Sequence, residues 1–391
     1  MAIARNIAES LERASWIRRM FESAHKLREE RGAENVADLS LGNPCNEPPA
    51  EFFDHLQEES EIRTGLRHRY MLNPGYPEVR ERVAAHLARR TGLPYDSADI
   101  CLTVGAAGAL NVILRSILDP GDDVVLCAPA FVEYPFYVAN YGGHVCHVPS
   151  DENFLPDVNR IADACTGTTR AVIINAPNNP TGRIYPERTY MDLGRALAQR
   201  SAANSRPIYL IFDDPYHALN YTGKPSPMPG QFYDQLMYVT SFSKELGLAG
   251  ERVGYIAIHP NAHAREDLRA AFPFSMRAIG QVNCPAIMQR AISKLIDRPT
   301  DDVRDFYRIR RDRVVEVFDE IGLETTPLDG GFYAFPKSPE ADDLVFCRRM
   351  LDQGLVIVPG MAFGAPGHFR MSYAADLDVL DRGLAILKRS L

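Results

Sequence analysis

The sequence has no excess of basic residues. Of its 391 residues, 43 are Lys or Arg and 51 are Asp or Glu, which gives a net charge of −8, and the two signs are mixed along the chain. Nucleic acids and anionic membranes bind basic surfaces, so this balance argues against either as a partner. Lysine itself is scarce, because the whole chain contains only six. Each lysine in a predicted site is therefore informative.

Cysteine pairs and a secretory signal are also missing. The seven cysteines are scattered, odd in number and without CxxC spacing, as in proteins of a reducing compartment, and we predict no disulfide. Residues 2–30 have the amphipathic, Arg- and Glu-rich pattern of a helix rather than the apolar run of a secretory signal. We therefore expect a cytoplasmic protein.

The chain lacks internal repeats, low-complexity tracts and a Pro/Gly/Ser-rich linker. With 391 residues, 46% of them hydrophobic, it can bury more core than one compact domain usually holds. We expect a large domain over residues 46–295. The small domain would combine residues 1–45 with residues 296–391.

Short apolar runs alternate with segments of helical period, which predicts an α/β fold with a mainly parallel sheet and helices on both faces. The predicted strands of the large domain are 100–104, 124–127, 171–175, 208–212, 237–240 and 253–258. After Pro299, a long charged helix at 302–321 is followed by strand-like runs at 355–358 and 369–372. This change of pattern indicates a smaller α+β domain.

Polar residues follow several of these strands at the point where each strand ends. Parallel α/β sheets bind ligands beyond the carboxyl ends of their strands, so we expect these loops to share one pocket. The loops contain Pro129-Ala130-Phe131, residues 175–182, Asp213-Asp214-Pro215-Tyr216 and Ser241-Phe242-Ser243-Lys244.

This set of side chains suits pyridoxal phosphate. A lysine amine forms an imine with the aldehyde of that cofactor, and a carboxylate keeps its pyridine nitrogen protonated. Lys244 alone among the lysines follows a predicted strand within a group of hydroxyl residues. The phosphate needs backbone N–H groups at a helix start and an arginine, which residues 105–110 and Arg252 can supply.

The order and spacing of the motifs carry a resemblance. The central motifs are Asn179-Pro180-Thr181-Gly182, Asp213 with Tyr216, and Ser241-x-Ser243-Lys244 followed by Arg252-x-Gly254. The flanking motifs are Leu41-Gly42-Asn43-Pro44, Tyr70 followed by Gly75 and Glu78-x-Arg80, and Phe363-Gly364-x-x-Gly367-x-x-Arg370. Over nearly its whole length the chain resembles a fold-type I, class I/II pyridoxal-phosphate aminotransferase of the aspartate aminotransferase superfamily.

The resemblance implies that Lys244 forms the internal aldimine with pyridoxal phosphate and moves the proton during amino transfer between an L-amino acid and a 2-oxo acid. Asp213 would pair with the pyridine nitrogen, Tyr216 and Asn179 with the phenolic oxygen, and Phe131 would stack on the ring. The phosphate ligands would be Ala106, Ala107, Ser241, Ser243 and Arg252, with Tyr70 from the second subunit of a homodimer.

The resemblance also places the substrate carboxylate. Arg370 would hold it in a bidentate pair, with Asn179 and the backbone N–H of Gly42 nearby. Two residues depart from the family pattern. Ala107 stands where many relatives have Ser or Thr, so only its backbone contact carries over. Phe131 stands where Tyr or Trp is common, but a phenyl ring still stacks. No metal is expected.

Each motif taken alone has a structural interpretation. Turn chemistry explains Asp213-Asp214 and residues 178–182, and a plain helix start explains residues 105–110. Arg252 could form a structural ion pair with Glu251 or Glu245, and Phe131, Tyr134 and Tyr137 could be core aromatics. Arg370 could lie on the solvated face of a strand. The joint arrangement favours the cofactor site.

Other function classes fit less well. Ser241-x-x-Lys244 matches the nucleophile motif of penicillin-binding proteins, but its partner motifs are absent. His144, Cys146 and His147 cannot all face one side of an extended segment, so a metal site there is disfavoured. A transcription regulator with an aminotransferase-like domain would need an N-terminal DNA-binding domain, for which the pattern leaves no room.

Reaction type and substrate are less constrained than the cofactor. The same residues support other carbanion reactions, and a carbon–sulfur β-lyase is the main alternative. Arg277 lies one residue from the position where some relatives bind a side-chain carboxylate. The residues Phe332, Tyr333, Trp16 and Tyr134 could instead line an aromatic or aliphatic pocket.

Overall fold

The computed structural model describes residues 3–4, 7–8, 11, 27–204 and 206–391. The predicted N-terminal helix at 2–30 therefore falls largely outside the described residues, and so does Trp16. Within the described part, no helix has the length and apolar character needed to cross a membrane.

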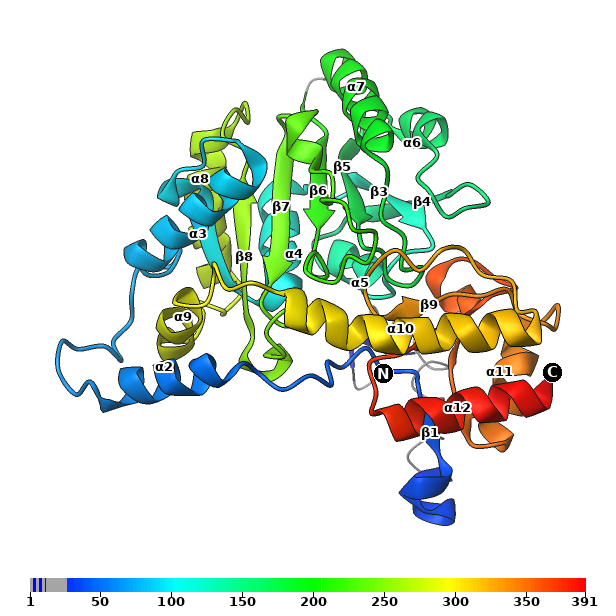
Figure 1. Cartoon of the computed structure of the whole chain (residues 1–391). Coiled ribbons are helices and arrows are strands. Elements are labelled where there is room, and N and C mark those ends of the chain that lie inside the picture. The colour runs from blue at the N-terminus through cyan, green and yellow to red at the C-terminus, as the bar shows by residue number, and fades with distance from the viewer. Residues whose placement is uncertain (1–2, 5–6, 9–10, 12–26, 205) are drawn as a thin grey trace.

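A seven-stranded sheet forms the centre of the molecule (Figure 1). Its strand order is β2-β8-β7-β6-β5-β3-β4, and all neighbours are parallel except β8, which is antiparallel to β2 and β7. The strands are β2 (Ile100–Val104), β3 (Asp123–Ala128), β4 (His144–Pro149), β5 (Thr169–Asn175), β6 (Tyr209–Asp213), β7 (Leu236–Ser241) and β8 (Val253–Ile258). The predicted α/β fold with a mainly parallel sheet is confirmed.

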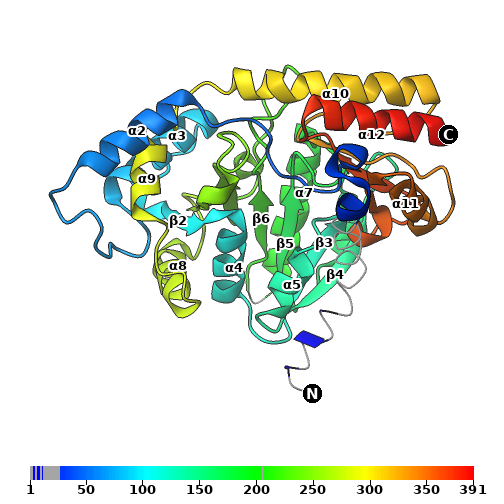
Figure 2. The ribbon, with the colours of Figure 1, turned by 90° about the horizontal axis from the view of Figure 1, so that it is seen from below.

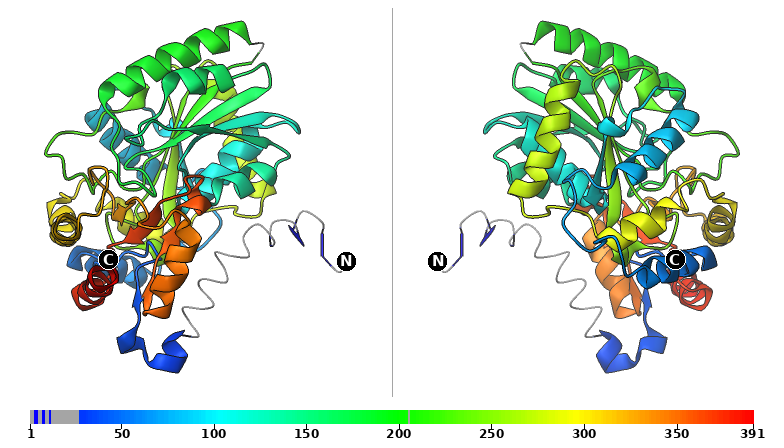
Figure 3. Two further views of the ribbon diagram at one scale, coloured as in Figure 1. Left: turned by 90° about the vertical axis from the view of Figure 1, so that its right-hand side faces the viewer. Right: turned by 90° about the vertical axis from the view of Figure 1, so that its left-hand side faces the viewer.

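Helices cover both faces of this sheet, as the side views in Figure 3 show. One face packs against α4 (Gly105–Ile117), α5 (Tyr134–Ala139) and α8 (Arg265–Ala278). The other face packs against α3 (Pro77–Thr91), α6 (Val158–Ala164), α7 (Glu187–Ala203) and α9 (Ala286–Ser293), and α2 (Ala50–Glu61) lies beside α9. Successive residues of a strand point to opposite faces, so Ile173 enters the first core while Val172 and Ile174 enter the second.

The edge strand β4 is absent from the predicted strands. An edge strand pairs on one side only, so it carries less of the apolar pattern by which buried strands are found in a sequence. Its residues His144 and His147 are exposed, and Cys146 is half-buried. The described residues contain no group of His, Cys, Asp or Glu placed to hold a metal ion.

A second group of elements lies beyond the carboxyl ends of the parallel strands. It contains β1 (Ala37–Asp38), β9 (Tyr333–Ala334), β10 (Leu355–Val356), β11 (Val358–Pro359), β12 (Phe369–Ser372), α10 (Asp301–Ile321), α11 (Asp343–Asp352) and α12 (Leu377–Ser390). These elements share their own hydrophobic core, and α10 and α12 lie side by side in Figures 1 and 2. The single strand predicted at 355–358 was wrong, because β10 pairs with β1 whereas β11 pairs with β12. The domain boundaries at 45/46 and 295/296 stay a prediction.

Candidate active site

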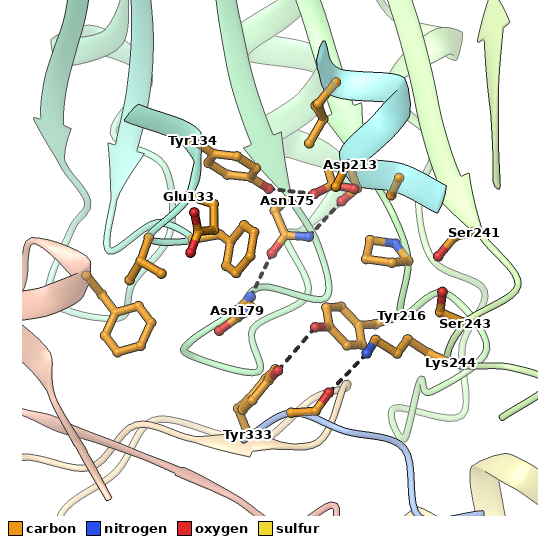
Figure 4. Close-up of a pocket in the computed structure, with 18 of the residues that line it drawn as sticks. Glu133, Tyr134, Asn175, Asn179, Asp213, Tyr216, Ser241, Ser243, Lys244 and Tyr333 are labelled. Carbon is orange, nitrogen blue, oxygen red and sulfur yellow. Dashed lines mark hydrogen bonds between the residues drawn. The ribbon is translucent and has the colours of Figure 1, made fainter. Parts of the chain in front are cut away.

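The loops that follow the parallel strands line a common pocket. It has a volume of about 400 Å³, and every predicted site residue except Tyr70 lines it (Figure 4). The predicted residues brought together are Gly42, Ala106, Ala107, Phe131, Asn179, Asp213, Tyr216, Ser241, Ser243, Lys244, Arg252 and Arg370. They come from segments that are far apart in the sequence, so turn chemistry or packing of any single motif does not explain their convergence.

Lys244 is a half-buried amine in the loop that follows β7. Its Nζ donates a hydrogen bond to the carbonyl of Gly42 at 3.0 Å and lies 5.4 Å from the ring centre of Phe332. Burial, helped by the positive charge of Arg252, lowers the pKa of Lys244 to about 8. A substantial fraction of this amine is therefore neutral, and thus nucleophilic, at slightly alkaline pH.

Asp213 is a buried carboxyl at the end of β6. The hydroxyl of Tyr134 donates to its Oδ2 at 2.6 Å, whereas its buried Oδ1 has no partner among the described residues (Figure 4). Burial raises the pKa of Asp213 to about 7. A cationic ring nitrogen placed at Oδ1 would satisfy this oxygen and would favour the ionised carboxylate.

The start of α4 faces Arg252 and forms a concave, positively charged wall. Gly105 has φ +69°, and a Cβ there would lie only 2.8 Å from Nη2 of Arg252. A Cβ on Gly254 would in turn lie 3.0 Å from the backbone nitrogen of Ala106. Backbone N–H groups at a helix start and a guanidinium are the donors that bind phosphate. Ser241 and Ser243 line the same pocket.

Arg370 is buried rather than placed on a solvated strand face. From β12, its Nη1 donates to Oδ1 of Asn179 at 3.0 Å and its Nη2 donates to the carbonyl of Ser40 at 2.6 Å. Its guanidinium stacks between the rings of Tyr333 and Phe363, at 4.6 and 4.7 Å from their centres. Burial lowers its pKa, but a guanidinium keeps its charge in proteins. Its buried Nε has no partner in the described part of the chain, so the group can accept a carboxylate.

A buried polar network lies directly behind these residues. Asp214, next to Asp213, accepts from Nη2 of Arg90 at 2.9 Å and from the hydroxyl of Tyr238 at 3.0 Å. Burial acts to lower the pKa of His217, but the carboxylate of Glu245, 2.9 Å from its Nε2, raises it above its ordinary value. Asp214, His217 and Glu245 each directly follow a pocket residue in the sequence, and the contact between His217 and Glu245 joins the loops after β6 and β7. These contacts also exclude the ion pair of Arg252 with Glu245.

Two of the singled-out residues lie away from the pocket. Tyr70 is 90% exposed in the loop between α2 and α3, which projects from the edge of the molecule in Figures 1 and 2. Arg277 is exposed and packs on the ring of Phe274. Of the aromatic candidates, Tyr134 and Tyr333 line the pocket, whereas Phe332 is fully buried behind it.

The comparison with protein families decides the identity of this site. A family model described as aminotransferase class I and II matches residues 34–387. The chain belongs to this aminotransferase family. Class I and II aminotransferases use pyridoxal phosphate, and the unpaired oxygen of Asp213, the amine of Lys244 and the donor-lined start of α4 fit that cofactor. The chain is thus a pyridoxal-phosphate-dependent aminotransferase, as the sequence motifs predict.

Individual aminotransferases are similar over nearly the whole chain. A probable aspartate/prephenate aminotransferase of Thermus aquaticus is 34% identical and is aligned over 90% of this chain and 91% of its own length. The aspartate/prephenate aminotransferase of Thermus thermophilus is 32% identical over 92% of each chain. Among solved structures, an aminotransferase of Eubacterium rectale superposes with a TM-score of 0.94 at 32% identity, covering 100% of this chain and 98% of that one. The predicted family and fold are therefore confirmed.

Tyr134 and Glu133 are among the pocket residues that the sequence motifs did not assign to the site. Tyr134 was considered only as a core or wall aromatic, although its hydroxyl contacts Asp213. Glu133 was not considered, although it lines the pocket. Glu133 lies in the loop after β3 and Tyr134 begins α5 directly behind it, so the rule that ligands bind at carboxyl strand ends applies to both.

Proposed function

We propose that this pocket transfers an amino group from an L-amino acid to a 2-oxo acid, with Lys244 as the residue that holds the cofactor and moves the proton. The observation that carries the proposal is the convergence of a depressed-pKa lysine, a carboxyl with an unpaired buried oxygen and a phosphate-binding helix start in one pocket. Bound pyridoxal phosphate supplies an aldehyde and an electron-accepting ring.

The proposed cofactor contacts follow from where each group lies. Asp213 would hold the ring nitrogen protonated, and Tyr216 and Asn179 would hydrogen-bond the phenolic oxygen. Phe131, whose ring packs edge-on against Tyr134 at 5.4 Å, would cover one face of the ring. The proposed phosphate ligands are Ala106, Ala107, Ser241, Ser243 and Arg252, with Tyr70 of a second subunit.

Substrate handling is proposed for Arg370 and Lys244. Arg370 would bind the α-carboxylate, because it is charged, buried and without a carboxylate partner in the described chain. With the carboxylate fixed there, the Cα–H bond would face the Nζ of Lys244. This amine would take the proton from Cα of the amino donor and would return a proton to Cα of the 2-oxo acid in the second half of the transfer. Arg370 is buried and Lys244 is half-buried, and charge interactions are stronger there than in open water.

A homodimer is proposed because Tyr70 is isolated in the single chain. The loop that carries it also exposes Leu66 and Leu72, at 63% and 67%. A symmetric pair would cover these apolar side chains and would bring each Tyr70 to the other subunit's pocket. We also propose the two-domain division given above and a cytoplasmic location.

The half-reaction tests the proposed function. An amino donor alone should bleach the visible absorption of the protein and release one 2-oxo acid per site, and a 2-oxo acid should restore the absorption. Continuous release of pyruvate with ammonia or a thiol, without an acceptor, would instead support the β-lyase.

A further inference from the structure

We propose that Glu133 sets the substrate side-chain preference of this enzyme, so that amino acids whose side chains end in a positive charge or a hydrogen-bond donor are favoured over those that end in a carboxylate. The inference rests on the proposed amino transfer at this pocket. It departs from the names of the relatives, since aspartate and prephenate both carry a second carboxylate.

Glu133 lies inside the candidate active site. It follows Phe131 and Val132 in the loop after β3 and lines the pocket together with both. Figure 4 shows its side chain in the pocket, on the side of Tyr134 and Asn179. Phe131 and Asn179 are assigned to the cofactor ring, so Glu133 is placed where a substrate bound at that ring would extend.

The carboxylate of Glu133 has no partner that would neutralise it. No hydrogen bond or ion pair of its side chain is present among the described residues, whereas the carboxylates of Asp192 and Asp302 each pair with an arginine. The residue is half-buried, and burial raises its pKa. A partly desolvated, unpaired carboxylate gains most from a substrate that brings a cation or a donor.

The positive charges of the pocket are all assigned elsewhere. Among its described lining residues, the cations are Lys244, Arg252 and Arg370, proposed for the cofactor aldehyde, the phosphate and the α-carboxylate. Arg277, which the sequence offered as a second carboxylate ligand, is exposed on α8 and does not line the pocket. A substrate with a side-chain carboxylate would therefore meet the carboxylate of Glu133 and no uncommitted cation of the described chain.

The test compares substrates that differ in charge but hardly in shape. Glutamate and glutamine form one pair, and citrulline and arginine form the other. For the wild-type enzyme we expect kcat/KM to favour glutamine over glutamate and arginine over citrulline, each at least about tenfold. In Glu133→Gln, both ratios should fall to within about threefold, because the side chain keeps its size and loses its charge. Glu187→Gln, on the exposed start of α7, is the matched control and should keep the wild-type ratios.

A binding measurement separates the effect of the Glu133 charge on ligand affinity from any effect of the substitution on catalysis. Glutarate and its half-amide glutaramate each offer one carboxylate to Arg370 and cannot react, and calorimetry gives their affinities for the cofactor-loaded protein. The half-amide should bind about tenfold more tightly to the wild type, and this preference should vanish in Glu133→Gln and in Glu133→Ser. A wild-type preference for glutamate or glutarate, or ratios that Glu133→Gln leaves unchanged, would overturn the inference. Failure of every amino acid in the half-reaction would instead refute the proposed function.

Discussion

Two regions carry predicted site residues: the loops at the carboxyl ends of the large sheet, and the loop between α2 and α3. They differ in whether the contacts of these residues are already made within a single chain. In the first region, the buried side chain of Asp213 and the half-buried side chain of Lys244 are held by contacts within the chain. In the second region, Tyr70 is 90% exposed and lines an open hollow together with residues 281–286.

This difference separates two kinds of site residue. A residue of the first kind is preorganised by its own domain, so its substitution should act in every subunit independently. A residue of the second kind gains its role only when another chain is present. The predictions below test whether the two regions act in these two ways.

The largest effect is expected for Lys244, because no other described residue of the pocket offers an amine. Lys244→Ala should lower the rate of amino transfer on the order of 10⁴-fold or more, since both the covalent attachment and the proton transfer are lost. Borohydride treatment of the wild type, followed by mass mapping, should place the cofactor on Lys244. Attachment to any of the other five lysines would refute the assignment.

The second largest effect is expected for Arg370. Removing one partner of a buried charge pair typically costs about 3–5 kcal/mol, so Arg370→Ala should lower kcat/KM for an amino acid by several hundred-fold. Arg370→Lys should recover little, because an ammonium cannot reproduce the planar fork held between Tyr333 and Phe363.

The matching amine without a carboxylate is the control for Arg370. It should react at similar rates with the wild type and with both variants, and the visible absorption of the bound cofactor should stay unchanged. Equal losses for the amine and the amino acid would mean that Arg370 is structural and that the carboxylate binds elsewhere.

An intermediate effect is expected for Tyr134. Its hydroxyl donates to Asp213 at 2.6 Å, and a buried hydrogen bond to a charged group contributes up to ~3 kcal/mol. Tyr134→Phe should therefore lower kcat on the order of 100-fold. Because this bond lowers the pKa of Asp213, its loss should move the acid limb of the pH–rate profile toward higher pH. An unchanged acid limb would contradict a role through Asp213.

The sequence predicted the first region better than the second, for a physical reason. Strand-end motifs such as Ser241-x-Ser243-Lys244 combine local chain geometry with chemistry, so the parallel sheet places them together without further information. The contacts behind them, such as Arg90 to Asp214 across 124 residues, depend on the packing of α3 against the sheet and leave no local pattern. Tyr134 escaped for the same reason, since its hydroxyl meets Asp213 only in the folded chain.

The edge strand β4 and the short strands β10 and β11 were harder still to predict from the sequence. The strand β4 lacks the apolar run of a buried strand, and the pairing of β10 and β11 with different neighbours is decided by long-range contacts. Tyr70 was assigned by resemblance alone, and which subunit's pocket it serves can be tested only with two different chains.

The smallest effect is expected for Tyr70. One hydrogen bond to a phosphate at the rim of the site contributes ~1.5 kcal/mol, so Tyr70→Phe should weaken cofactor binding about tenfold. The measurement is the dissociation constant of pyridoxal phosphate, obtained from the visible absorption during titration of the cofactor-free protein. Cofactor binding within twofold of the wild type would argue against the phosphate contact.

Mixed dimers then show which chain Tyr70 serves. In a dimer of one Lys244→Ala chain and one Tyr70→Phe chain, exchange across the interface leaves one pocket with both groups intact and the other with neither. Half of the pockets should then bind the cofactor with wild-type affinity and be active at a cofactor concentration that leaves Tyr70→Phe dimers mostly empty. If Tyr70 serves its own chain, every pocket carries one defect and the activity of the mixed dimer equals the mean of the two parent dimers. That result would place the loop between α2 and α3 with the preorganised residues and remove the distinction between the two regions.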